Sequence, residues 1–240
     1  LFDEYIRLVR GLQPKTFVAE NVSGLVKGTA KGYFLEILAA LKGCGYKVRA
    51  AVLDAQWLGV PQMRQRVIFV GVRNDLPAEP CHPAPLPYRY SVRDALPWIT
   101  KAVHDTSGIM SVGAITDEPS PAVMANRAGT HFVEAESRMA PCYRAEWDKM
   151  KVGDQPEKFF SLVKVNPESP SPTVDTSALR ASVCHPYERR KFSIAELRRI
   201  CAFPDDFILT GSYAQQWERL GRSVPPVMMY HIARCVEEVL

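Results

Sequence analysis

Residues 45–73 read GYKVRAAVLDAQWLGVPQMRQRVIFVGVR, and this stretch decides the fold class. Apolar and polar side chains alternate over residues 46–53, which predicts a strand with one covered face. Residues 66–73 form a nearly continuous apolar run, which predicts a strand covered on both faces. We therefore expect two strands of one sheet, joined by a loop at 56–65.

The residues before this stretch add two helices and another strand. Residues 1–12 carry an apolar helical face, and residues 34–41 carry a second one. Residues 16–19 predict a short buried strand, with Glu20 at its carboxyl end. This order of elements is typical of half of an open α/β sheet. In such sheets functional side chains gather beyond the carboxyl ends of strands, where Glu20 and the 56–65 loop are expected.

The composition changes after residue 77. Six prolines lie between Pro77 and Pro97, which indicates a linker or an extended crossover. Residues 99–180 show no long helical pattern and are rich in Ser, Thr and Pro. Helix starts return after residue 188. They are the capping boxes Ser193-x-x-Glu196 and Ser212-x-x-Gln215, and the pair Pro225-Pro226.

The composition is that of a folded, mildly basic chain. It has 240 residues, 47% of them apolar and 23% charged, with a net charge of +4. This size supports one large domain or two small ones. No run of 18 or more apolar residues exists, so we expect no membrane helix. The chain begins Leu1-Phe2-Asp3, and we expect no signal peptide. We expect a cytoplasmic location, associated with the nucleoid in a prokaryote or encoded by a phage.

The six cysteines have no metal-binding spacing. No pair is separated as C-x-x-C, so a zinc site is not expected, and no other metal motif is present. Without a signal peptide, scattered cysteines are typical of reduced thiols in a cytosol. They are Cys44, Cys81, Cys142, Cys184, Cys201 and Cys235.

Several local motifs could carry chemistry, and each has a purely structural alternative. Glu20-Asn21 places a carboxylate at a strand end, where it could donate a proton, or it is an ordinary turn. Residues 59–66, GVPQMRQR, place two arginines in a loop that binds a ligand or is a solvated hairpin. Residues 203–207, FPDDF, precede a turn at residues 221–226, GRSVPP. That turn could pack on a cofactor or simply cap helices.

The order and separation of these motifs are more specific than any one of them. Together they resemble the C-terminal portion of a DNA cytosine-5 methyltransferase of bacterial or phage type. The resemblance covers residues 1–76 and 188–240 closely, and the middle only in general character. The matching segments are FVAENVSGL (17–25), the 45–73 stretch, RKFSIAELRRICAFPDDF (190–207) and GRSVPP (221–226).

The resemblance implies an α/β architecture with two parts. One is a partial Rossmann-like methyltransferase domain with a mixed or parallel sheet. The other is a smaller, irregular, β-rich target-recognition domain, with double-stranded DNA held between the two. The implied divisions are residues 1–76 for the C-terminal half of the catalytic domain, 77–187 for linker and recognition domain, 188–218 for its helical support, and 219–240 for the turn and helix that return to the catalytic domain.

The resemblance also implies the chemistry and the residues that carry it. The family flips the target cytosine out of the duplex. A Cys thiolate adds to C6, and C5 then takes a methyl group from S-adenosylmethionine. Glu20 matches the glutamate that binds the protonated ring at N3, and Asn21 orients its loop. Arg66 matches the arginine near the cytosine O2, Arg64 braces the pocket or a phosphate, and Gln62 supports the same pocket.

Cofactor binding is implied at the GRSVPP turn. Ser223 and Val224 match the turn that closes over the methionine end of S-adenosylmethionine. The family usually has Asn where this chain has Arg222, which leaves the cofactor contact at that position open.

The sequence contains no Pro-Cys-Gln nucleophile loop and no Gly-rich cofactor loop. We therefore expect no methylation by the chain alone, and we expect the N-terminal portion of the enzyme, in the same gene or as a separate subunit, as its partner. The alternatives are a non-enzymatic DNA-binding remnant or recognition subunit, and a Pro-rich interaction protein. Basic residues are candidate DNA contacts or plain solubility charges. They are Arg127, Arg138, Arg144, Lys149, Lys151 and Lys164.

Overall fold

The computed structural model describes residues 2–99, 137–157, 161–178 and 183–238. The chain forms two compact units. The first comprises Leu1–Leu58, Arg64–Leu86 and Met228–Leu240, and the second comprises Gly59–Met63 and Pro87–Val227. Sequence boundaries were expected after residues 76, 187 and 218. Those boundaries stay a prediction; the compact units group residues 77–86 with the first unit and residues 59–63 with the second.

A three-stranded sheet organises the first unit. Its strands are β1 (Thr16–Val22), β2 (Tyr46–Asp54) and β3 (Gln65–Arg73), in the order β1-β3-β2. The central strand β3 is antiparallel to both neighbours, so β1 and β2 run in the same direction. The carboxyl ends of β1 and β2 therefore meet the start of β3 at one end of the sheet. The expected mixed α/β sheet is confirmed for this unit.

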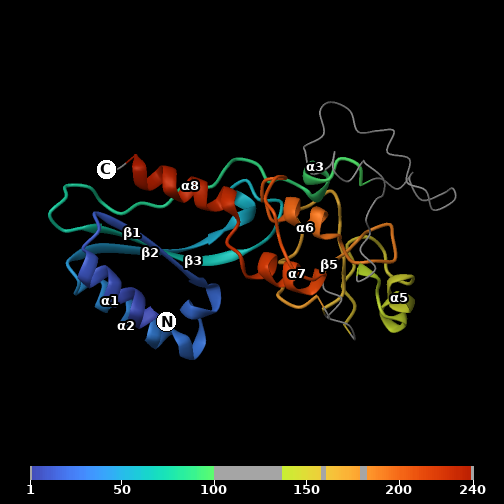
Figure 1. The fold of residues 1–240 in the computed structure, drawn as a ribbon, viewed down its shortest axis with the longest axis horizontal. Helices are drawn as coiled ribbons and strands as arrows, with labels where there is room; N and C mark the ends of the chain where they lie inside the picture. Colours follow the sequence, from blue (N-terminus) through green and yellow to red (C-terminus); the bar gives the residue numbers. More distant parts are fainter. Residues whose placement is uncertain (1, 100–136, 158–160, 179–182, 239–240) are drawn as a thin grey trace. The chain divides into compact units, whose positions relative to one another are not determined.

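Helices cover both faces of this sheet. Figure 1 shows α1 (Phe2–Leu12) and α2 (Lys31–Lys42) on one face and α8 (Pro226–Glu237) on the other. Alternate residues of β3 explain this, because Val67 and Phe69 belong to the core under α1 and α2. The next residues, such as Ile68, are also fully buried and point to the opposite face. The continuous apolar run of β3 is thus accounted for.

One glycine in β3 allows close packing of the core. Phe17 pairs with Gly71 across β1 and β3, and a Cβ on Gly71 would lie 2.1 Å from the Phe17 ring. That ring also packs edge-on against Tyr46, with centroids 5.1 Å apart. Gly71 is therefore required by the close approach of a neighbouring side chain.

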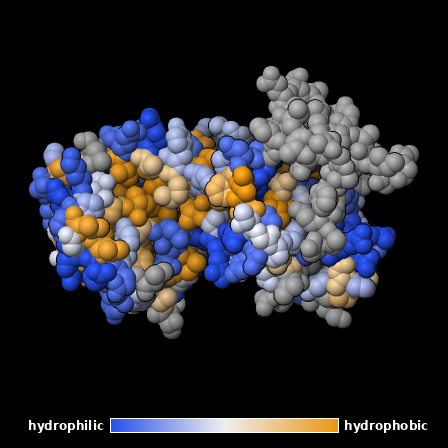
Figure 2. All heavy atoms as spheres, viewed as in Figure 1, coloured by the Kyte–Doolittle hydropathy of each residue, from blue (hydrophilic) through white to orange (hydrophobic). Residues whose placement is uncertain are grey.

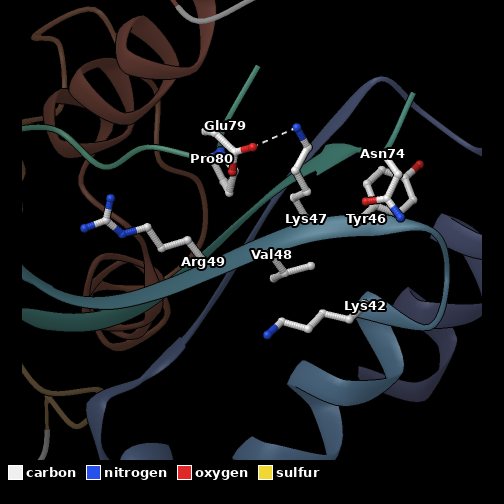
Figure 3. A pocket seen from close by; sticks show the side chains of 8 residues that line it. All are labelled: Lys42, Tyr46, Lys47, Val48, Arg49, Asn74, Glu79 and Pro80. Atoms are coloured by element: carbon white, nitrogen blue, oxygen red, sulfur yellow. Dashed lines mark hydrogen bonds and ion pairs between the residues drawn. The ribbon is translucent and has the colours of Figure 1, made fainter. Parts of the chain in front are cut away.

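The Pro-rich segment at residues 77–86 is a strap on the first unit, and not a free linker. Lys47 Nζ donates to the Leu76 carbonyl at 3.0 Å and pairs with Glu79 at 2.9 Å (Figure 3). The His82 Nε2 atom lies 3.0 Å from the Ile68 carbonyl oxygen. At the end of the strap, the Leu86 N–H donates to the Trp57 carbonyl at 2.8 Å. The Lys47 side chain and the backbone carbonyls of Ile68 and Trp57 thus hold the strap along its length.

The strap is also joined covalently to the last helix. Cys81 and Cys235 form a disulfide, with Cα atoms 6.4 Å apart across a sequence separation of 154. The expectation of six reduced thiols is wrong for this pair. The two cysteines are adjacent because the strap packs beside α8 in the fold. The spacing of cysteines in the sequence does not predict that contact. The other four cysteines form no disulfide.

Short helices dominate the described part of the second unit. Two-residue strands β4 and β5 pair in parallel, and these are the only named strands among the unit's described residues. The expected β-rich character is therefore absent from that part. The elements are α3 (Val92–Ala95), α5 (Pro141–Trp147), β4 (Val163–Lys164), β5 (Val183–Cys184), α6 (Ile194–Ile200) and α7 (Tyr213–Arg222). Among the described residues of the first unit, 3-10 turns lie at η1 (Ser23–Val26), η2 (Gly28–Ala30) and η3 (Ala55–Trp57).

The helices α6 and α7 begin where the capping boxes predict. Ser193 accepts from the Glu196 N–H while Glu196 accepts from Ser193, and Ser212 and Gln215 repeat the arrangement. Trp217 of α7 is fully buried in the core of this unit. The predicted helix starts are confirmed.

Lys164 is a structural residue. Its side chain is only 7% exposed, and its ammonium lies 3.4 Å from the centre of the Trp147 ring. It also donates to the carbonyls of Trp147 and Met150, at 3.3 and 2.9 Å. Burial lowers the pKa of Lys164. The expectation of a DNA contact is therefore wrong here, because the charge is held inside the unit.

The remaining candidate DNA contacts differ in status. Arg127 lies outside the described residues. The other four, on or near α5, are exposed and available to a polyanion. They are Arg138, Arg144, Lys149 and Lys151. Within the described parts of the chain, no helix is long and apolar enough to cross a membrane.

Candidate active site

Glu20 and Arg66 form an ion pair at the end of the sheet. Glu20 lies near the carboxyl end of β1, and Arg66 is the second residue of β3. The antiparallel register pairs Val22 with Arg66, which brings the Glu20 Oε2 and Arg66 Nε atoms to 3.4 Å. The two side chains are 40% and 13% exposed. The structure thus joins two residues that the sequence placed 46 positions apart.

The pair combines one accessible acceptor with one half-buried donor. Burial lowers the pKa of Arg66, and the Glu20 carboxylate opposes that shift. The Arg66 Nη1 atom donates to the Gln65 carbonyl at 2.8 Å, which leaves further guanidinium N–H groups for a ligand. The Glu20 carboxylate is open to solvent.

Asn21 makes a local bond. Its Oδ1 atom accepts from the N–H of Val22 at 2.8 Å, just before η1 begins. This bond shapes the turn that follows Glu20. An orienting role for Asn21 is a prediction that this geometry supports.

Arg64 is 1% exposed, so its guanidinium faces the interior and not the solvent. Its backbone N–H donates to Asp54 Oδ1 at 3.2 Å, and its carbonyl accepts from Ala55 N at 2.9 Å. The buried position favours the bracing role over direct contact with a phosphate. Sequence reasoning missed Asp54, although an acidic residue between a strand and a short helical turn is a recognisable capping signal.

Gln62 belongs to the second unit and is fully buried there. Its Nε2 atom donates to Cys201 Sγ at 3.2 Å, and its Oε1 atom has no partner among the described residues. The backbone around it is held by Ser171, whose N–H donates to the Pro61 carbonyl at 2.9 Å and whose carbonyl accepts from Met63 at 2.8 Å. Gln62 therefore anchors its loop in the second unit.

The GRSVPP segment contains the end of a helix. Gly221 lies inside α7, and a Cβ there would lie 2.1 Å from the Asp175 carbonyl oxygen. The close approach of the Asp175 backbone to α7 explains why residue 221 is a glycine. A Gly-led turn that binds a cofactor is not required to explain it. Arg222 points outward and pairs with Glu218. Arg222, which stands where the family usually has Asn, thus places an exposed charge at the end of α7.

Ser223 and Val224 form the turn between α7 and α8. The Ser223 hydroxyl donates to the Leu220 carbonyl at 2.7 Å, so it caps α7. Val224 is half-buried, and its N–H donates to no carbonyl of the described residues. Because Pro225 and Pro226 have no N–H, Val224 provides the available backbone donor of this turn. One donor beside an apolar side chain fits the role expected at the methionine end of S-adenosylmethionine.

The cysteines and acids of the described residues define what chemistry is available. Burial raises the pKa of Cys184 to about 12, which makes it a poor nucleophile. Cys44 and Cys201 are buried, and Cys142 is exposed. No group of three His, Cys, Asp or Glu side chains in the described residues could hold a metal. The site therefore offers an acid and a cation, and no activated thiol.

A separate pocket of about 630 Å³ lies far from the Glu20 end of the sheet. Figure 3 shows Lys42, Tyr46 and Arg49 around it, together with the Lys47–Glu79 pair of the strap. The pocket is open and its cations diverge. It is not part of the candidate active site.

Comparisons with known proteins point in one direction. The family model described as C-5 cytosine-specific DNA methylase matches residues 1–238. The Type II methyltransferase M.SacI of Streptomyces achromogenes is 30% identical over all of this chain and 64% of its own length. The Type II methyltransferase M.MthTI of Methanothermobacter thermautotrophicus is 29% identical over all of this chain and 71% of its own length. The chain thus spans about two thirds of these relatives.

Solved structures share the fold. A protein assigned as a DNA modification methyltransferase, encoded within an Escherichia coli prophage, aligns with a TM-score of 0.72 and 19% identity, over 98% of this chain and 72% of its own. A DNMT2 mutant of Spodoptera frugiperda aligns with a TM-score of 0.60 and 16% identity, over all of this chain and 71% of its own. At these identities the likeness extends to the fold alone.

Proposed function

The chain belongs to the C-5 cytosine-specific DNA methylase family, and on that premise we propose that it forms part of an enzyme that methylates C5 of cytosine in double-stranded DNA. S-adenosylmethionine, when bound, supplies the methyl group. The relatives are named Type II methyltransferases, so we place the enzyme in a restriction-modification system. A DNA substrate of this kind places it beside the nucleoid in the cytoplasm.

The observation that carries the proposal is the Glu20–Arg66 pair. Cytosine presents N3 and O2 side by side on one edge, so recognition needs a carboxylate and a donor that are also side by side. Glu20 and Arg66 meet that need at 3.4 Å from two different strands. Glu20 then holds the proton at N3, which makes C6 more electrophilic, and Arg66 donates to O2. Access to this edge requires a flipped base.

Other residues support this pair and the cofactor. Asn21 shapes the turn after Glu20, Arg64 braces the start of β3, and Gln62 anchors the loop before it. The turn at Ser223 and Val224 would hold the methionine end of S-adenosylmethionine through the Val224 N–H and side chain. No metal is required for these roles.

The thiolate that attacks C6 must come from outside this chain. No Pro-Cys-Gln loop is present, and every described cysteine except Cys142 is either buried or disulfide-bonded. The edge of β1 that faces away from β3 has no strand partner among the described residues, and Val22 on it is 56% exposed. Figure 2 shows apolar atoms exposed on the first unit around the sheet and α8. We infer that the N-terminal portion of the enzyme pairs with this edge.

A recognition subunit without catalysis is the second candidate, because the nucleophile loop is absent. Tritium transfer from S-adenosylmethionine to duplex DNA separates the two. The chain alone should transfer none, and addition of the N-terminal portion should restore transfer. Transfer by the isolated chain would contradict the need for a partner, and no restoration would favour the recognition subunit.

Glu20→Gln tests the carrying observation in the restored protein. We expect transfer to fall about 100-fold or more, because the amide cannot hold the N3 proton as a carboxylate does. Glu36→Gln, at an exposed position of α2, is the matched control and should leave the rate unchanged. An unchanged rate in Glu20→Gln would remove Glu20 from the mechanism.

A further inference from the structure

Asp54, at the carboxyl end of β2, closes the base of the loop that leads to the two arginines. Its Oδ1 atom accepts from the backbone N–H of Gln56 at 3.3 Å and from that of Arg64 at 3.2 Å. Its Oδ2 atom accepts from the side-chain amides of Gln56 at 2.8 Å and Gln65 at 3.4 Å. One carboxylate therefore binds the residues on both sides of the loop.

A capping role alone does not account for these contacts. Capping of η3 requires only the bond from the Gln56 N–H. The bonds to Arg64 and Gln65 instead reach across to the start of β3. A backbone bond from Ala55 N to the Arg64 carbonyl, at 2.9 Å, closes the same base.

The register connects Asp54 to the candidate active site. Asp54 pairs with Gln65, and the preceding residue Leu53 pairs with Arg66. Strand ends fray when their last bonds are lost, so the Asp54 contacts hold the first two residues of β3, Gln65 and Arg66, in the strand. Arg66 must stay in place to lie 3.4 Å from Glu20.

We propose that Asp54 is a positioning residue for cytosine methylation, which acts by holding the Arg64 backbone and through it the Arg66 guanidinium. The inference rests on the proposed function, and it adds a residue that touches neither base nor cofactor. Asp54 thus resembles the outer carboxylates that orient binding groups in other enzymes, where small misplacements cost large factors in rate.

The first measurement needs no activity. Amide hydrogen exchange is compared in the unsubstituted chain, Asp54→Ala and Asp54→Asn. We expect Asp54→Ala to speed exchange at Arg64 and Gln56 by about 10-fold or more, since both N–H groups lose their acceptor. Asp54→Asn keeps one oxygen for these two donors and should protect them in part. Amides at Val70, in the centre of β3, report any loss of global stability.

The second measurement uses methyl transfer by the restored protein. Asp54→Ala should lower kcat about 100-fold while the KM for DNA changes little, because positioning acts on the reacting geometry. Asp54→Asn should recover part of the rate. Asp75→Ala is the matched control, since Asp75 pairs with Arg73 at the opposite end of β3.

The outcomes are distinct. Unchanged exchange at Arg64 in Asp54→Ala would overturn the proposal, and so would faster exchange with an unchanged kcat. Absence of transfer in the unsubstituted restored protein would refute the proposed function itself. The exchange rates would still decide whether Asp54 holds the Arg64 amide.

Discussion

Glu196→Gln tests the buried ion pair that supports the second unit. Arg190 Nη1 and Nη2 donate to the two Glu196 oxygens at 2.7 and 2.9 Å, and Glu188 pairs with the same guanidinium at 2.5 Å. Glu196 also accepts from the Ser193 N–H at 2.7 Å. Gln keeps the size and one acceptor for that cap, so the substitution removes mainly the charge.

The expected magnitude follows from the pKa of Glu196. Burial alone would raise it, but the Arg190 charge and hydrogen bonds lower it from 4.5 to about 2. At about 1.4 kcal/mol for each pKa unit, the ionised form is stabilised by about 3 kcal/mol in the fold. Loss of one partner of a buried pair costs about 3–5 kcal/mol, which agrees. We therefore expect Glu196→Gln to lower the free energy of unfolding by about 3 kcal/mol at pH 7.

The assay is urea unfolding followed by tryptophan fluorescence. Three of the four tryptophans, Trp98, Trp147 and Trp217, lie in the second unit, so the signal reports that unit. Glu218→Gln, which breaks the exposed pair with Arg222, is the control and should cost less than about 0.5 kcal/mol.

The pH dependence gives an independent check. A carboxyl group whose folded pKa is lowered contributes stability above its unfolded pKa, near 4.5, and loses it as pH falls toward about 2. The unsubstituted protein should lose this contribution over that range, and Glu196→Gln should not. A loss of less than about 1 kcal/mol in the free energy of unfolding at pH 7 would contradict this prediction, since it would mean that desolvation cancels the attraction.

Other predictions concern packing, a buried cation and the disulfide. Gly221→Ala should destabilise the second unit by about 2 kcal/mol or more in the same urea assay, because its Cβ would overlap a backbone carbonyl, and near-neutral behaviour would contradict this close approach. Lys164→Ala should lower the free energy of unfolding by about 1–3 kcal/mol, because contacts with Trp147 are lost. The dependence of DNA affinity on salt concentration, measured by fluorescence anisotropy, should stay the same. A weaker dependence on salt in the variant would mean that Lys164 contacts a phosphate. Under oxidising conditions Cys81→Ser should lower the Tm, because the cross-link to Cys235 is lost, and a reductant should lower the Tm of the unsubstituted protein but not of the variant.

Much of the first unit was predictable because its signals are local. The apolar run of β3 and the helical patterns of α1 and α2 follow from which side chains each element must bury. The capping boxes of α6 and α7 were read directly from residues three apart. Glu20 and Arg66 were both expected as site residues. Their pairing required the antiparallel register, which periodicity does not specify.

The errors share one cause. Lys164 looked like a DNA contact, but its charge is held by Trp147 and two carbonyls, residues that the fold alone brings near. Residues 77–86 were expected to form a linker or an extended crossover, and that choice stayed open because prolines indicate extended chain without saying what the chain lies against. Asp54 was overlooked, since only the folded loop brings the Arg64 amide to its carboxylate.

The class of sheet and the helix starts could be predicted without the fold, because periodicity and capping act over a few neighbouring residues. The family could be predicted from the order and separation of the motifs. Tertiary structure decided which polar groups meet. It paired Glu20 with Arg66, buried Gln62 beside Cys201, and joined Cys81 to Cys235. Buried polar groups such as the Gln62 amide need partners, and in this chain those partners lie far away in sequence.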